Sequence, residues 1–95
     1  MAQVTPYDDR INAYMRQQGA VKVGVFGSYA RNEARADSDL DLMAWFEEQQ
    51  SLLGMIRIER ELSELLGIKV DLLTEQAVSP YLIDRIRKEL KVISG

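Results

Sequence analysis

The sequence predicts a single α/β (α+β) domain, residues 1–95, in which a small mixed β-sheet carries its helices on one face. Three observations predict this fold class. Segments with helical periodicity alternate with segments of strict two-residue alternation along the whole chain. Each expected strand has one apolar face, which a helix can cover. Two of these strands carry acidic residues on the opposite face, which is therefore expected to stay open.

The first half of the chain is expected to contain a helix, a strand and a second, short helix. Thr5 and Pro6 are typical of a helix N-cap and first helical residue, and apolar residues follow at helical spacing until Gly19. The segment 21–26 alternates with a period of two residues and predicts a strand. We expect a short helix at 29–36, which leads into a polar loop.

The second half of the chain predicts further strands and two more helices. Residues 39–46 alternate again, so a strand is expected there. The longest helix is expected at 51–66, with an apolar stripe that consists of Leu52, Leu53, Ile56, Leu62, Leu65 and Leu66. A third strand is expected at 68–74 and a last helix at 80–89, and 90–93 is a candidate for a short edge strand.

Composition excludes several classes of function. Hydrophobic residues make up 46% of the sequence and charged residues 28%, which is typical of a globular protein. The net charge of −3 provides no general field for nucleic acid, so direct nucleic-acid binding is not expected. The chain has no cysteine and no histidine, which excludes thiolate and histidine zinc sites and serine–histidine or cysteine–histidine catalysis.

The chain shows no targeting or membrane signal. Its N-terminus does not resemble a signal peptide, and no apolar run approaches the ~20 residues that a membrane span needs. We therefore expect a cytoplasmic protein without a membrane partner.

Asp39 and Asp41 stand two residues apart in the expected strand 39–46, so both side chains leave the same face, within reach of one cation. If the strand at 68–74 lies beside this one, Asp71 joins them from its own open face. Hard oxygen ligands of this kind suit Mg²⁺ or Mn²⁺ rather than zinc. An Asp-Leu-Asp string is also common among solvated acids at a loop-to-strand junction, and taken alone it does not identify a metal site.

Gly27 and Ser28 stand at the turn between the strand 21–26 and the expected short helix. Backbone N–H groups at such a turn point outward, and the helix dipole favours an anion. Glycine lets a phosphate approach the main chain closely, and the Ser28 hydroxyl can donate a hydrogen bond to it. As an isolated feature, the pair equally fits an ordinary glycine turn with a serine N-cap.

The turn and the acids together resemble a known signature. Gly-Ser at 27–28, ten intervening residues and Asp-Leu-Asp at 39–41 are similar to the G-S-x₁₀-D-x-D pattern of the DNA polymerase β-like nucleotidyltransferase superfamily. The string GSYARNEARADSDLDL resembles the minimal nucleotidyltransferases of bacteria and archaea, and Asp71 stands where that family has its third acid. Asn32 departs from the glycine often found there, but asparagine tolerates a left-handed turn. The resemblance covers essentially the whole chain.

The resemblance implies a polymerase β palm-like fold and nucleotidyl transfer, in which an acceptor hydroxyl attacks the α-phosphorus of a nucleoside triphosphate and pyrophosphate leaves. It implies that Asp39 and Asp41 hold a Mg²⁺ ion on the triphosphate and share a second ion with Asp71. Asp71 also stands where a carboxylate can accept the acceptor's proton. The nucleotide-binding residues are then Gly27, Ser28 and Arg31, although Arg31 equally suits a solvent-facing helix position.

A partner protein is also implied by the resemblance. Stand-alone domains of this size resemble the antitoxin half of a two-protein system, which transfers AMP from ATP to a tyrosine of a helical HEPN-domain ribonuclease toxin. No residue here by itself indicates tyrosine or adenine, so this assignment rests on the family. Two alternatives stay open: a non-catalytic antitoxin that only covers its partner, and a nucleotidyltransferase for a small-molecule or nucleic-acid acceptor with a separate substrate-binding subunit.

Overall fold

The computed structural model describes residues 3–94, and its helices and strands follow one another in a mixed order along the chain. In order, the elements are α1 (Asp8–Gln17), β1 (Ala20–Phe26), β2 (Leu40–Phe46), α2 (Leu52–Leu66), β3 (Val70–Leu73), the short 3₁₀ helix η1 (Glu75–Ala77), α3 (Pro80–Glu89) and β4 (Lys91–Ser94). Every strand expected from the sequence is present, including the edge strand β4. Among residues 3–94, no helix has the length and apolarity that crossing a bilayer requires.

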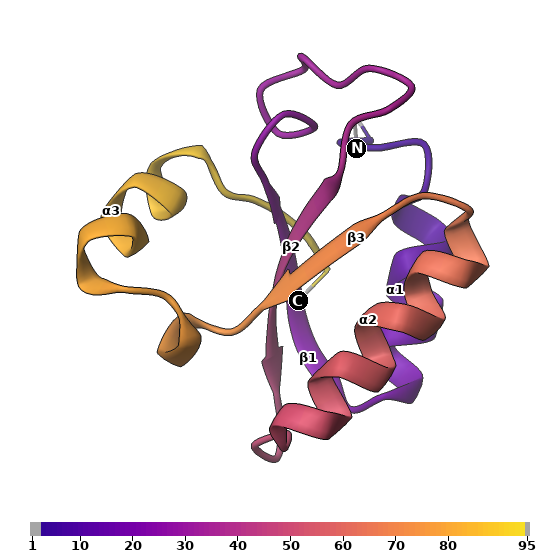
Figure 1. Cartoon of the computed structure of the whole chain (residues 1–95), viewed down its shortest axis with the longest axis vertical. Coiled ribbons are helices and arrows are strands. Elements are labelled where there is room, and N and C mark those ends of the chain that lie inside the picture. The colour runs from indigo at the N-terminus through magenta and orange to yellow at the C-terminus, as the bar shows by residue number, and fades with distance from the viewer. Residues whose placement is uncertain (1–2, 95) are drawn as a thin grey trace.

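The four strands form one mixed sheet in the order β3-β2-β1-β4 (Figure 1). β1 is antiparallel to both of its neighbours, β2 and β4, whereas β2 and β3 are parallel. A parallel pair needs a crossover connection, and α2 provides it. The order places the strand that carries Asp71 next to the strand that carries Asp41, which is the condition on which the sequence-based metal site depended.

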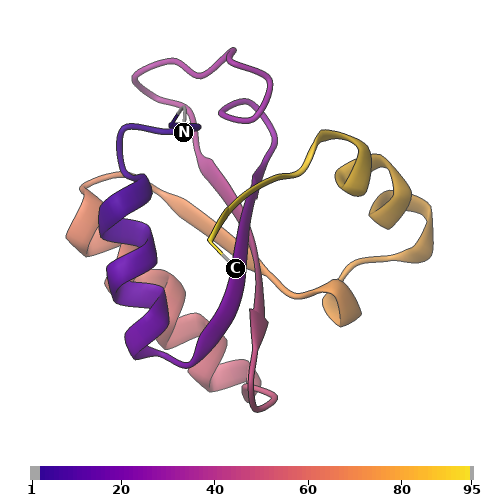
Figure 2. The same cartoon turned by 180° about the vertical axis from the view of Figure 1, so that it is seen from behind.

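α1 and α2 cover one face of the sheet (Figures 1 and 2). Alternate residues of β1, β2 and β3 point toward these helices, because side chains of a strand leave opposite faces in turn. The fully buried core between the layers includes Ile11, Met15, Val23, Val25, Leu40, Leu42, Ile58, Leu62 and Val70. This packing confirms the expected fold class, a small mixed sheet with helices packed on one face.

α3 lies on the opposite side of the sheet from α1 and α2 (Figures 1 and 2). Its Ile86 packs with Phe26 and Met43 in a second, smaller apolar cluster, which Leu73 extends. Met43 and Asp41 are two positions apart on β2, so this cluster lies on the acidic face. α3 therefore covers part of the face that the sequence left open, and it bounds the acidic residues on one side.

The buried stripe of α2 differs from the one expected from the sequence. Ile58, Leu62 and Leu66 face the core, whereas Leu52 and Leu53 are 77% and 79% exposed. Leu53 precedes Leu62 by about two and a half helical turns, so the two leucines point in opposite directions. The leucines and isoleucine of the expected stripe lie on more than one face of the helix. Only the face that packs against the sheet is buried.

The helix expected at 29–36 is wrong: this segment forms successive turns between β1 and β2. The N–H of Arg31 donates to the Gly27 carbonyl at 3.1 Å, so one helical turn begins. Asn32 then takes a left-handed conformation with φ of 59°, which ends the helical path after that turn. The tolerance of asparagine for this conformation is as expected.

Candidate active site

Asp41 and Asp71 are register partners on the parallel strands β2 and β3. The residues on either side of them point into the core, so both carboxylates leave the opposite, acidic face. Asp41 is half-buried, because the glycine–serine turn and α3 lie close to it. The sheet thus brings together two acids that are far apart in the sequence.

Asp39 lies just before the first residue of β2, at the edge of the acidic group. Its Oδ2 is 3.6 Å from Lys69 Nζ, and both side chains are exposed. The Leu40 N–H donates to the Lys69 carbonyl at 2.9 Å, which brings the two segments side by side. Across residues 3–94, the carboxylates do not form a preassembled group of three metal ligands. Asp39 is instead paired with the ammonium group of Lys69.

Gly27 directly follows β1 and lies against Asp41. Its φ is +74°, which favours glycine, and a Cβ atom at this position would collide with the Asp41 carboxylate. The next residue, Ser28, lines the same pocket as Asp41. The turn expected to bind phosphate therefore lies immediately beside the acids expected to bind metal.

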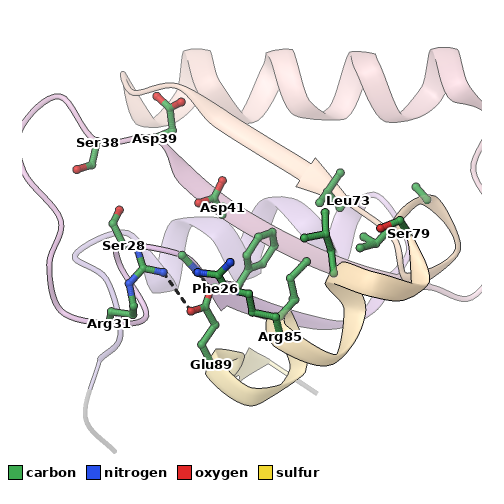
Figure 3. Close-up of a pocket in the computed structure, with 15 residues that line it drawn as sticks. Phe26, Ser28, Arg31, Ser38, Asp39, Asp41, Leu73, Ser79, Arg85 and Glu89 are labelled. Atoms are coloured by element: carbon green, nitrogen blue, oxygen red, sulfur yellow. Dashed lines mark hydrogen bonds and ion pairs between the residues drawn. The ribbon is translucent and has the colours of Figure 1, made fainter.

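A pocket of about 660 Å³ is lined on one side by the turn and by two of the three acids, Asp39 and Asp41 (Figure 3), whereas Asp71 is not among its lining residues. The other side is formed by β3, η1 and α3, and the apolar side chains there include Leu73, Leu82 and Ile86. A concave site with few polar groups and an apolar wall is typical of small-molecule and cofactor sites, and this volume is within their usual range.

The electrostatics of the acidic group favour a bound cation. Burial, followed by the negative charges of Asp71, Asp39 and Glu89, raises the pKa of Asp41 from 3.8 to about 6, although Arg31 opposes the shift. A divalent cation would relieve this repulsion, and all of the candidate donors are hard carboxylate oxygens. The residues therefore fit Mg²⁺ or Mn²⁺.

Arg31 is held at the pocket by two carboxylates. Its Nε donates to Glu33 Oε1 at 2.7 Å, and its Nη1 donates to Glu89 Oε2 at 3.0 Å. These hydrogen bonds, to Glu33 first and then to Glu89, raise the pKa of Arg31. Arg31 thus lines the pocket, as the nucleotide-binding expectation requires, although it lies on a turn and not on a helix.

Glu89 also belongs to the candidate site, although no motif in the sequence points to it. Its Oε1 accepts a hydrogen bond from the Gly27 N–H at 2.9 Å, so this backbone donor, expected for phosphate, is already engaged. Burial raises the pKa of Glu89, but the hydrogen bonds from Gly27 and Arg31 outweigh it and leave the pKa below its usual value. No local pattern links a residue at the end of α3 to a turn 62 residues earlier, so nothing in the sequence indicated this contact.

The chain is similar in sequence and fold to known nucleotidyltransferases. Residues 9–95 match the family described as polymerase beta, nucleotidyltransferase. The chain is 42% identical over 72 residues to the protein adenylyltransferase MntA of Thermococcus cleftensis. That alignment covers 76% of this chain and 73% of the Thermococcus protein. A solved structure described provisionally as a minimal nucleotidyltransferase is 40% identical, with 95% of each chain covered and a TM-score of 0.77.

A more distant structure shares the fold. It is a solved complex of a tri-AMPylated Shewanella oneidensis HEPN toxin with an MNT antitoxin, at 18% identity and a TM-score of 0.78. The alignment covers 98% of this chain and 73% of that chain. The family match includes the glycine–serine turn and all three aspartates. The chain therefore belongs to the polymerase β nucleotidyltransferase family, as one of its minimal nucleotidyltransferases.

Proposed function

We propose that this nucleotidyltransferase transfers AMP from ATP to a tyrosine hydroxyl of a HEPN-domain toxin and so acts as its antitoxin. The observation that carries the proposal is the register pair of Asp41 and Asp71 beside the Gly27–Ser28 turn. Two carboxylates suited to a divalent metal, those of Asp39 and Asp41, line one pocket together with donors suited to phosphate. Phosphoryl and nucleotidyl transfer depend on this combination of positioning and charge stabilisation.

The residues of the site divide the work of the transfer. Asp39 and Asp41 would hold one Mg²⁺ ion and share a second with Asp71, and Mn²⁺ suits the same ligands. Bound Mg²⁺ supplies positive charge for the attacking and leaving oxygens. The acceptor oxygen bonds to the α-phosphorus while the bond from that phosphorus to the bridging oxygen of the β-phosphate breaks. Asp71 accepts the proton of the acceptor hydroxyl, and pyrophosphate leaves.

Support for AMP and for a HEPN partner comes from the relatives. The Thermococcus protein is named as a protein adenylyltransferase, and the MNT antitoxin of the same fold is in complex with an AMPylated HEPN toxin. In this chain, the apolar wall of the pocket offers a surface on which a nucleotide base can pack. The acidic group at the other wall is where the triphosphate and its metal belong.

Mass spectrometry of the partner tests the proposal. Incubated with ATP, Mg²⁺ and the HEPN-domain partner, the parent protein should add the mass of AMP to that partner. The variants Asp39→Asn and Asp41→Asn should lose this addition by a factor of about 100 or more, because each removes a metal-binding carboxylate. The matched control is Asp37→Asn, which removes an exposed carboxylate from the preceding loop and should act as the parent does.

Two results would redirect the proposal. If the double variant Asp39→Asn/Asp41→Asn neutralises the toxin as completely as the parent does at the same molar ratio, complex formation rather than AMP transfer is the mechanism. If labelled AMP is recovered on a nucleic acid or a small molecule while the partner stays unmodified, the protein transfers AMP but the proposed tyrosine acceptor is wrong.

A further inference from the structure

Glu89 connects the two elements that face the triphosphate position, the Gly27–Ser28 turn and Arg31. Figure 3 shows its side chain reaching from α3 to the Arg31 guanidinium. We propose that Glu89 is a positioning residue for the triphosphate, which holds the turn and the guanidinium so that their remaining donors face the pocket. This inference rests on the nucleotidyl transfer proposed above and assigns a role to a residue outside the G-S-x₁₀-D-x-D pattern.

The backbone around Glu89 is firmly anchored. Ile86, one turn earlier on α3, is buried against Phe26 at the end of β1. Leu90, the next residue, lies against Gly24 so closely that a Cβ atom there would be 2.7 Å from Leu90 Cδ1. Apolar packing on both sides thus fixes the end of α3 against β1. A carboxylate attached to this anchored segment can hold a turn in place.

Both carboxylate oxygens of Glu89 are engaged, and each partner keeps donors for a ligand. Glu89 uses only the N–H of Gly27 and the Nη1 group of Arg31. In the part of the chain that the structure describes, the N–H and hydroxyl of Ser28 and the Nη2 group of Arg31 donate to no protein acceptor. These three donors belong to residues that line the pocket, so they are the groups left to bind the phosphates.

The position of the turn also sets its distance from the acids. Gly27 lies against the Asp41 carboxylate, so any displacement of the turn changes the spacing between the phosphate donors and the metal-binding oxygens. Nucleotidyl transfer depends strongly on such spacing. By holding the Gly27 N–H, Glu89 fixes this spacing from the C-terminal end of α3.

A carboxylate beside a triphosphate can also weaken nucleotide binding, which is the opposite of a positioning role. If Glu89 occupied the position of a phosphate group, it would compete with the nucleotide, and its removal would strengthen binding. The geometry favours positioning, because the charge of Glu89 is balanced by Arg31 in a charge-assisted hydrogen bond and its side chain is only 24% exposed. The two effects predict opposite signs for the same measurement.

Titration of a non-hydrolysable ATP analogue with Mg²⁺ into Glu89→Ala, Glu89→Gln and the parent decides between them. We expect Glu89→Ala to weaken binding about tenfold, the scale of one charge-assisted hydrogen bond. Glu89→Gln should fall between the two, because its amide oxygen can still accept from the Gly27 N–H while the ion pair with Arg31 is lost. Lys88→Ala, at an exposed position of the same helix, is the control and should bind as the parent does.

Two further measurements separate positioning from general stabilisation. The Gly27 amide proton signal should move upfield in Glu89→Ala, and thermal melts should show both variants folded at the assay temperature. If Glu89→Ala does not fold, Glu89→Gln carries the test alone. In the Arg31→Ala background, Glu89→Ala should weaken analogue binding less than it does in the parent, because the contact between Glu89 and Arg31 is already absent.

The outcomes distinguish this inference from the proposed function. Parent-like or tighter analogue binding by folded Glu89→Ala and Glu89→Gln would overturn the positioning role, and so would an unchanged Gly27 amide signal in Glu89→Ala. Failure of the parent itself to bind the analogue with Mg²⁺ at millimolar concentration would instead overturn the proposed nucleotide chemistry, and the inference with it.

Discussion

Gly27 and Asp41 are in such close contact that a Cβ atom at Gly27 would overlap the Asp41 carboxylate. The contact arises because Phe26, the last residue of β1, is the register partner of Asp41 on the antiparallel strand β2. The chain that leaves β1 therefore turns directly over the acid. This relationship couples the turn proposed to bind phosphate to the strand proposed to bind metal, so a side chain added at Gly27 should disturb both.

Gly27→Ala should be more harmful than its backbone conformation alone explains. Gly67 has nearly the same φ, +72° against +74°, but no atom lies within 4 Å of its added Cβ. Gly67→Ala should therefore lose only about 1 kcal/mol of the free energy of unfolding, through backbone strain. Gly27→Ala should lose clearly more and should also bind the ATP analogue poorly. Equal losses in urea denaturation, with unchanged analogue binding, would contradict the close contact.

Asp41→Asn should stabilise the metal-free protein at neutral pH. The raised pKa of Asp41, about 6 against 3.8, means that the folded state holds its proton more tightly than the unfolded chain does. The parent should therefore lose stability, relative to Asp41→Asn, as the pH rises from 3.8 to about 6, and the difference should persist above that range.

Thermal melts in EDTA across this pH range provide the measurement, and Asp37→Asn is the control for an exposed carboxylate. In Mg²⁺, the parent should gain more stability than Asp41→Asn, because the cation binds the folded state of the parent more tightly. A clearly destabilised Asp41→Asn in EDTA at neutral pH would show that Asp41 is a structural hydrogen-bond acceptor.

Lys69→Met should strengthen Mg²⁺ binding about two- to threefold, because Lys69 competes with the cation for Asp39. The pair is exposed and its atoms are 3.6 Å apart, so the melting temperature should change little. Lys91→Met removes the same charge from an exposed site on β4 and serves as the control. The difference should shrink at high ionic strength, and a salt-independent difference would argue against an electrostatic origin.

Leu62→Ala and Leu53→Ala test which face of α2 is buried. Leu62 is fully buried, so its truncation should cost about 2–5 kcal/mol in the free energy of unfolding. Leu53 is 79% exposed, and its truncation should cost less than about 0.5 kcal/mol. Chemical denaturation of the two variants measures both values. Similar costs at the two positions would mean that the helix is rotated in solution.

The sequence by itself determined the layout of the elements and the positions of the acids along them. Two-residue alternation is a local property of a strand, so it predicted the strands and placed Asp39 and Asp41 on one face. The helix at 80–89 and the left-handed turn at Asn32 also depended on local preferences, and both are present. The helix expected at 29–36 failed because the conformation of Asn32 ended it after one turn.

Only the tertiary structure decided which segments meet. The register of Asp41 with Asp71, the face of α2 that is buried and the side of the sheet that α3 covers all depend on packing between distant segments. The contact between Glu89 and Gly27 is the clearest case, because it joins residues 62 positions apart. Local periodicity limits which face of an element can be buried, but the partner that buries it is selected by how the whole chain packs.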